Sequence, residues 1–232
     1  MIQEIVRDMK LHKKDIMLLW LMILLGFAVG FGMLYLIMLL DETTTDWAPL
    51  GTLMALVFAT GIMLFTGVLG YRQEFAVALS MGRRRKDFMA AYALRKTVWA
   101  LAAYGIVLAL YQVEKVLAGL MFGGKPLTED ISMGFLLEWQ FLVLWVLVLV
   151  LVCMFLGALY SHFGKPFGVV LYFLWLGGCI MLPNLVDEAT WLGAAFGWFG
   201  ALPGLVQAGI GVAAAGAMAV TVVVLGRKQM VR

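Results

Sequence analysis

The chain contains a series of apolar runs close to twenty residues long, the length that an α-helix needs to cross the hydrocarbon core of a bilayer. Its residues are 64% hydrophobic, whereas about half of a soluble domain is apolar. Because lipid offers backbone N–H and C=O groups no hydrogen-bonding partner, runs of this kind must be helical. The sequence therefore predicts an all-α integral membrane protein.

Six transmembrane helices are predicted within a single transmembrane domain over residues 1–232. The five prolines fall at or near the ends of the apolar runs, which supports these boundaries because proline is poorly tolerated inside a helix. The helices are expected at residues 16–40, 47–70, 98–120, 135–159, 167–182 and 203–225.

The distribution of Lys and Arg predicts that both termini lie in the cytoplasm. With the N-terminus inside, the outer loops hold only Lys115 and Lys125 of the 17 Lys and Arg residues. The others fall in cytoplasmic segments, and the largest group, seven, lies in residues 71–96. This asymmetry is what the positive-inside rule describes.

Residues 1–15 are predicted to form an amphipathic helix on the inner leaflet, since Ile2, Ile5, Val6 and Met9 recur at helical spacing. A solvated tail is the alternative. The first apolar run is too long for a cleavable signal sequence, so the first helix is expected to remain as an anchor.

Motifs of known catalytic or nucleotide-binding sites are missing from the sequence. It has no Walker loop, no H-E-x-x-H and no G-x-S-x-G pattern, so no enzymatic activity, cofactor or metal is expected in this chain. Ionisable residues are sparse in the apolar runs, which argues against an ion path. Glu114, Lys115 and Glu138 come closest, and water-facing helix ends are the expected positions for them.

The segment 71–97 is predicted to be a cytoplasmic hairpin of two helices joined by a basic turn. Gly82 is expected to end the first helix in a left-handed conformation, and Asp87 is expected to cap the second. Four consecutive cations follow the glycine, at residues 83–86. A cluster of this kind attracts anionic lipid by about 1 kcal/mol per charge, so membrane anchoring alone is one explanation for it.

A surface N-terminal helix, six spans and a short amphipathic helix between spans two and three resemble the layout of a type 2 ABC exporter permease. The stretch 75–88 is similar to the first cytoplasmic loop of small permeases of Gram-positive bacteria, where a hydrophobic residue precedes a Gly-x-x-Arg-Lys-x-Phe pattern. The matching residues are Leu79, Gly82, Arg85, Lys86 and Phe88.

The resemblance implies a multi-pass subunit of a bacterial cytoplasmic membrane, with a coupling helix between helices 2 and 3 that docks on a separate ABC ATPase. ATP and Mg would then be held by that partner, and the substrate would be a hydrophobic or amphipathic peptide, lipid or drug. It also implies a re-entrant segment at 183–202. The residues expected at the docking surface are Phe75, Leu79 and Gly82 for shape, and Arg83, Arg84, Arg85 and Lys86 for charge.

Glycines on two predicted helices make smooth faces that allow close helix contact. Gly26 and Gly30 lie in the first span, and Gly209 and Gly216 lie in the last. Such faces serve either packing within one subunit or a dimer. Since the resemblance implies two permease halves, the expected partners include a second copy or a sister permease, besides membrane lipid; no nucleic acid is expected.

Three other functions or families remain in competition with this hypothesis. The first is a non-transport membrane protein for peptide self-resistance or regulation, and the second is a secondary carrier or channel. The third is the FtsX/MacB type of permease, which has a similar Gly-x-x-Arg sequence. Those permeases carry a large outer domain after the first span, where this chain has the six residues 41–46.

Overall fold

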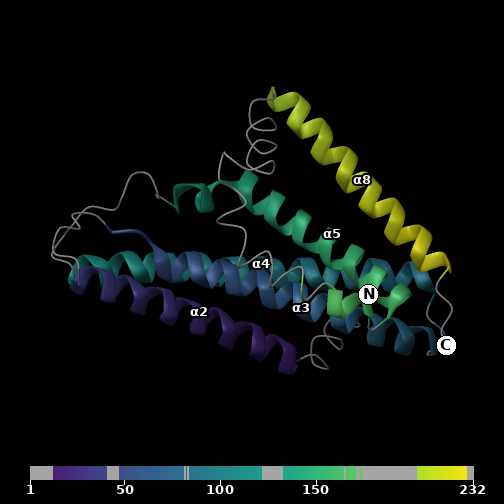
Figure 1. The fold of residues 1–232 in the computed structure, drawn as a ribbon, viewed down its shortest axis with the longest axis horizontal. Helices are drawn as coiled ribbons and strands as arrows, with labels where there is room; N and C mark the ends of the chain where they lie inside the picture. Colours follow the sequence, from purple (N-terminus) through teal and green to yellow (C-terminus); the bar gives the residue numbers. More distant parts are fainter. Residues whose placement is uncertain are drawn as a thin grey trace. The chain divides into compact units, whose positions relative to one another are not determined.

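The computed structural model describes residues 13–40, 47–80, 82, 84–121, 133–164, 166–170, 173 and 203–228. Its elements are α2 (Lys13–Leu40), α3 (Leu50–Ser80), α4 (Arg85–Met121), the 3₁₀ helix η2 (Met133–Leu137), α5 (Trp139–Phe163) and α8 (Gly204–Lys228) (Figure 1). Residues 166–170 are also helical.

Five of the described helices are long and apolar enough to cross a membrane, which makes the chain an all-α, multi-pass membrane protein. Many of their large apolar side chains are exposed, among them Leu21 and Leu24 on α2 and Val143 and Leu144 on α5. Exposed apolar surface on this scale is unfavourable in water and is normal where helices face lipid. The five apolar stretches are Ile16–Leu40, Leu50–Ser80, Arg85–Met121, Trp139–Phe163 and Ala208–Leu225.

Several predicted segments lie outside the described residues. These are the N-terminal interfacial helix up to residue 12, the loop 41–46, most of the predicted fifth span 167–182, and the re-entrant segment 183–202. Only 166–170 and 173 of the region around that fifth span are described, and they are helical.

The helices around the predicted hairpin are longer than the sequence boundaries indicate. α3 continues without a break past residue 70 to Ser80, and α4 begins at Arg85 and runs through to Met121. The two arms of the hairpin are therefore the ends of the neighbouring long helices. Hydropathy shows where the apolar part of a helix ends. The helix itself can continue beyond that residue, because its backbone hydrogen bonds do not depend on apolar side chains.

The predicted fourth span begins slightly later than expected. Residues 133–137 form the 3₁₀ turn η2, and α5 starts at Trp139. The Glu138 carbonyl accepts a hydrogen bond from Leu142 N at 3.3 Å, which places Glu138 at the N-cap.

The chain forms two compact units, each assembled from segments that are distant in sequence. The first contains residues 1–67 and 86–153, and the second contains residues 68–85 and 154–232. α3 and α5 thus contribute residues to both units.

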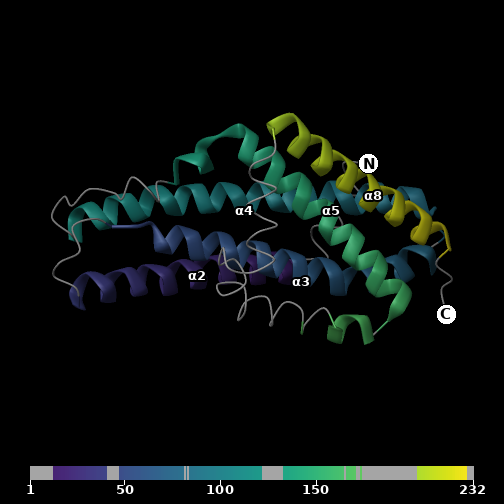
Figure 2. The same ribbon diagram turned by 45° about the horizontal axis from the view of Figure 1, so that its top comes forward.

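In the first unit, α2, the start of α3 and the end of α4 lie side by side (Figures 1 and 2). Two glycines of α2 permit this approach. A β-carbon on Gly30 would lie 2.3 Å from Leu50 O, and one on Gly26 would lie 2.9 Å from Phe58 Cγ. α2 and α3 therefore pack through a glycine face within one chain.

Buried tyrosines organise the rest of the first unit. Tyr104, Tyr111 and Leu136 form a core cluster, and the Tyr104 hydroxyl donates a hydrogen bond to Leu136 O at 2.5 Å. Tyr92 OH donates to Gly67 O at 2.7 Å. Each of these two hydroxyls finds a backbone acceptor, as buried polar atoms in a membrane protein must.

In the second unit, aromatic rings pack against small residues. Tyr71 is fully buried and stacks on Phe75 with ring centroids 5.9 Å apart. A β-carbon on Gly157 would come within 2.8 Å of Tyr71, so α5 approaches the ring closely at that glycine. Tyr160 packs in the same way against Gly168.

Candidate functional site

The candidate site is the basic turn, residues 82–86, which joins α3 to α4. Gly82 has φ +75°, a left-handed conformation that glycine adopts without steric cost. Its N–H donates to Leu79 O at 3.0 Å. The left-handed helix end predicted at Gly82 is therefore confirmed.

The start of α4 differs from the prediction. The helix begins at Arg85, so Asp87 lies within its first turn and is not the cap. The carboxylate of Asp87 still lies near the positive end of the helix dipole, where it is favourable by about 0.3–1 kcal/mol. Its position therefore offsets part of the repulsion that the basic residues around it create.

The cations of the basic turn destabilise the start of α4. Arg85 and Lys86 occupy the first turn of α4, where positive charge is unfavourable next to the unpaired N–H groups. Arg84 and Lys86 are exposed, and in the described part of the chain neither makes a hydrogen bond or ion pair. Arg85 is half-buried, and Arg83 lies outside the described residues. Arg84 and Lys86 are therefore available to an anionic partner.

The apolar residues expected at the docking surface are less exposed than the cations. Phe75 is 3% exposed and Phe88 is 5% exposed, so both rings are interior. Leu79 is half-buried. Phe75 therefore supports the turn from within, and the surface that a partner can contact consists of Leu79, Gly82, Arg84 and Lys86.

Two long helices carry the basic turn. α3 has 31 residues and α4 has 37, which correspond to lengths of about 46 Å and about 55 Å. The hydrocarbon core of a bilayer is about 30 Å thick. Each helix is therefore long enough to cross the core and to extend beyond it as one continuous rod.

At the other end of α3, a buried carboxylate corrects a prediction. Glu114 is fully buried, although a water-facing helix end was expected for it. It accepts hydrogen bonds from Gly51 N at 2.8 Å, from Thr52 N at 2.7 Å and from Thr52 Oγ1 at 2.5 Å. Two of these donors belong to the first turn of α3, whose N–H groups have no partner within the helix.

The sequence did contain a signal for this contact. The residues before Leu50 are Ala48 and Pro49, and neither side chain can accept a hydrogen bond from the helix start. A helix whose first turn is buried and has no capping side chain of its own needs an acceptor from elsewhere. Glu114, with the carboxylate closest to the end of an otherwise apolar helix, supplies it.

A second buried charged cluster lies at the start of the apolar part of α4. Arg95 is 5% exposed and Lys96 is 2% exposed, although both were expected among the cytoplasmic surface cations. Lys96 Nζ lies 4.9 Å from the centre of the Trp99 ring, and Arg95 Cζ lies 5.3 Å from the centre of the Tyr92 ring. Aromatic faces thus stabilise both cations.

The glycines at the predicted packing faces differ in their surroundings. Gly26 and Gly30 contact α3 of the same chain. A β-carbon on Gly209 or Gly216, both in α8, would have no neighbouring atom within 4 Å in the part of the chain that the structure describes. No described residue therefore covers the face of α8 that carries them.

Within the described ranges, no group of three or more His, Cys, Asp and Glu side chains is placed to hold a metal ion. The two acids singled out from the sequence occupy different surroundings, since Glu138 is exposed and Glu114 is engaged by α3. The arrangement offers surfaces for binding.

No family model, curated protein or solved structure matches the chain.

Proposed function

We propose that this chain is the membrane subunit of an ATP-driven exporter, resembling a type 2 ABC permease, and that it moves a hydrophobic or amphipathic substrate. The observation that supports the proposal best is the exposed basic turn at the joined ends of α3 and α4, two continuous helices longer than the membrane core. ATP hydrolysis would take place in a separate ATPase, which would hold ATP and Mg.

In this proposal the basic turn is the docking point. Arg84 and Lys86 would meet acidic groups of the ATPase, together with Arg83 and Arg85, while Leu79 and Gly82 would shape the contact. Phe75 would hold the end of α3 in place from the interior, where its ring stacks on Tyr71. A charged, exposed surface favours fast and reversible association with a soluble partner.

Movement of the ATPase would be transmitted by the helices themselves. An unbroken helix transmits displacement along its axis because each turn is fixed by its own hydrogen bonds. At the far end, α3 is attached to α4 through Glu114 and to α2 through Gly30. Displacement of the basic turn would therefore reach the opposite end of the span as a shift of three helices together.

The assembly would contain two membrane subunits and two ATPases in a bacterial cytoplasmic membrane. Six predicted spans make one half of such an exporter, and the glycine face of α8 at Gly209 and Gly216, which no described residue covers, would offer a surface for the second permease copy or a sister permease.

The test is capture of the partner. The tagged protein is purified in mild detergent from its native host, and every co-purifying chain is identified by mass spectrometry. We expect a stoichiometric soluble ATPase with the unaltered chain. An Arg84→Glu, Lys86→Glu double variant should lose it, because two charges of the docking surface are reversed.

Lys115→Glu is the control, since it reverses one charge toward the opposite end of α4. It should retain the ATPase. A membrane-inserted double variant that still captures the ATPase would refute docking at the basic turn. Unaltered protein that purifies without any ATPase would favour the non-transport protein, and activity that follows a proton or sodium gradient would favour the carrier.

A further inference from the structure

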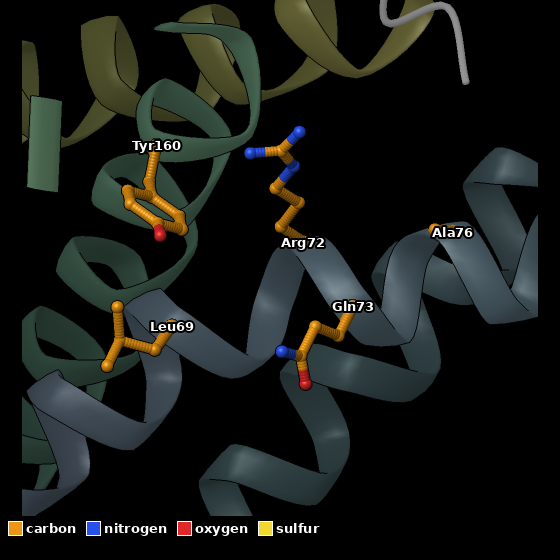
Figure 3. A pocket seen from close by; sticks show the side chains of 5 residues that line it. All are labelled: Leu69, Arg72, Gln73, Ala76 and Tyr160. Carbon is orange, nitrogen blue, oxygen red and sulfur yellow. The ribbon is translucent and has the colours of Figure 1, made fainter. Parts of the chain in front are cut away.

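A pocket of about 350 Å³ lies in the second compact unit, between the end of α3 and the end of α5 (Figure 3). Its wall combines a guanidinium, an amide and a phenol with two apolar side chains. In Figure 3 the ring of Tyr160 projects from α5 and the side chain of Arg72 rises from α3 beside it. The lining residues are Leu69, Arg72, Gln73, Ala76 and Tyr160.

The polar groups of the pocket have no partners of their own in the described part of the chain. Neither Arg72, Gln73 nor Tyr160 makes a side-chain hydrogen bond or ion pair there. Arg72 carries a permanent positive charge and up to five N–H donors, Gln73 offers an amide NH₂, and Tyr160 offers a hydroxyl. The pocket therefore presents a surplus of donors around one cation.

Local structure holds these groups in place. A β-carbon on Gly164 would lie 3.8 Å from Arg72 Nη1, so the guanidinium reaches the C-terminal end of α5. The unpaired carbonyls at a helix C-terminus favour a cation without neutralising it. The Tyr160 ring is fixed by its close contact with Gly168.

The pocket lies where two apolar stretches give way to polar residues. On α3 the apolar stretch ends at Gly70 and is followed by Arg72, Gln73 and Glu74. On α5 it ends near Tyr160 and is followed by Ser161 and His162. Such transitions, with an amphipathic tyrosine, mark the level of lipid headgroups.

We propose that this pocket binds the phosphodiester headgroup of an anionic phospholipid, with Arg72 on the phosphate and Leu69, one turn nearer the apolar stretch of α3, along the glycerol and the start of the acyl chains. The planar guanidinium matches two phosphate oxygens at once, which a lysine cannot do. Tyr160, on α5 beside Arg72, donates to another phosphate oxygen. The site is separate from the basic turn and does not depend on the proposed exporter function.

The experiment measures lipid binding to the delipidated full-length protein in a neutral detergent by native mass spectrometry. Phosphatidylglycerol is titrated in parallel with phosphatidylcholine. We expect one saturable phosphatidylglycerol per chain, with phosphatidylcholine bound more weakly, because its quaternary ammonium cancels the phosphate charge and would lie close to the Arg72 guanidinium. Equal binding of the two lipids would overturn the proposal.

Inorganic phosphate and glycerol 3-phosphate are added as competitors to identify the source of the phosphate. A lipid site should keep its phosphatidylglycerol in the presence of either, because the acyl chains contribute to binding. Displacement at low millimolar concentration would assign the pocket to a soluble phosphate compound instead and would overturn the lipid assignment.

Matched variants locate the site. Arg72→Gln should weaken phosphatidylglycerol binding by about tenfold or more, while Arg84→Gln, which removes an exposed cation from the basic turn, should leave the tight site unchanged. An equal loss in both variants would mean unspecific charge attraction and would refute the pocket. If Arg72→Gln does not purify as a single species, Tyr160→Phe keeps the ring against Gly168 and should still weaken binding; unchanged affinity would refute the assignment.

Discussion

At the scale of single residues, Glu114 shows how a buried carboxylate is stabilised and how the start of α3 is capped. A carboxylate that is fully buried in a membrane protein is costly unless charge and lone pairs are satisfied. Here the first turn of α3 and the Thr52 hydroxyl satisfy it, at 2.5 to 2.8 Å. The same contacts supply the cap that α3 lacks in its own sequence. They therefore stabilise both the buried carboxylate and the first turn of the helix.

Replacing Glu114 by Ala should therefore destabilise the protein by about 2–4 kcal/mol, since it removes charge-assisted hydrogen bonds and leaves the start of α3 uncapped. The measurement is the midpoint of unfolding in detergent as denaturing surfactant is added. Glu138→Ala is the control, because Glu138 is exposed, and should change stability by less than about 0.5 kcal/mol. Similar losses in the two variants would show that the buried contact is not stabilising.

At the scale of elements, two features determine how the helices are connected and how closely they pack. The first is the turn between α3 and α4, which depends on one residue in a left-handed conformation, Gly82 at φ +75°. The second is the contact between α2 and α3, which depends on the missing side chains of Gly26 and Gly30. Both are glycines, but one is required for its backbone angle and the others for the space they leave.

Gly82→Ala should lower stability by about 1–2 kcal/mol, because the left-handed conformation is unfavourable for a residue with a β-carbon. There is open space around the position in the described structure, so the cost is conformational and not a clash. Gly105→Ala is the matched control: Gly105 lies inside α4, also in open space, and alanine should stabilise the helix there by up to about 1 kcal/mol. If Gly82→Ala and Gly105→Ala shifted the unfolding midpoint in the same direction, the left-handed conformation would not be the cause of the loss at Gly82.

Gly30→Ala should destabilise the packing of α2 on α3 by about 1–3 kcal/mol, since the new methyl group would meet the backbone of Leu50 at 2.3 Å. Gly209→Ala places the same methyl group in open space on α8 and should be neutral or stabilising for the monomer. Unfolding midpoints of the two variants give the comparison. If Gly209→Ala instead lowers the apparent mass in detergent, its face forms an interface between chains.

At the scale of the whole molecule, the distribution of charge sets the orientation in the membrane. The predicted topology places the basic turn in the cytoplasm and Glu138 outside, because Lys and Arg concentrate on one side of the predicted spans. The exporter proposal requires this orientation, since a soluble ATPase can only reach a cytoplasmic turn.

Single cysteines at Arg84 and Glu138, in a chain with Cys153 and Cys179 replaced by Ala, test that orientation. Intact cells are treated with a membrane-impermeant maleimide. Glu138→Cys should be labelled in intact cells, and Arg84→Cys only after the membrane is permeabilised. Labelling of Arg84→Cys in intact cells would place the basic turn outside and remove the basis for ATPase docking.

Sequence reasoning alone identified the features that depend on short stretches of chain. The long apolar helices follow from comparing run length and hydropathy with the thickness of a bilayer, and the left-handed turn at Gly82 follows from a glycine between two helical patterns. Neither inference needs knowledge of what lies opposite a residue. A helix before Gly82 was predicted, but not that it continues α3 without a break to Ser80, because a helix that leaves lipid keeps its own hydrogen bonds and gives no hydropathy signal.

Only the tertiary structure decided which charged and aromatic side chains are buried. Glu114 meets a helix start 62 residues away, and Arg95 and Lys96 are enclosed although their neighbours in sequence look like a cytoplasmic surface. Phe75 is interior for the same kind of reason, and within the described residues Gly30 faces another helix whereas Gly209 has no neighbouring atom. Burial depends on segments distant in the chain, whereas apolar length and backbone turns are local properties; that difference separates what the sequence determined from what the fold decided.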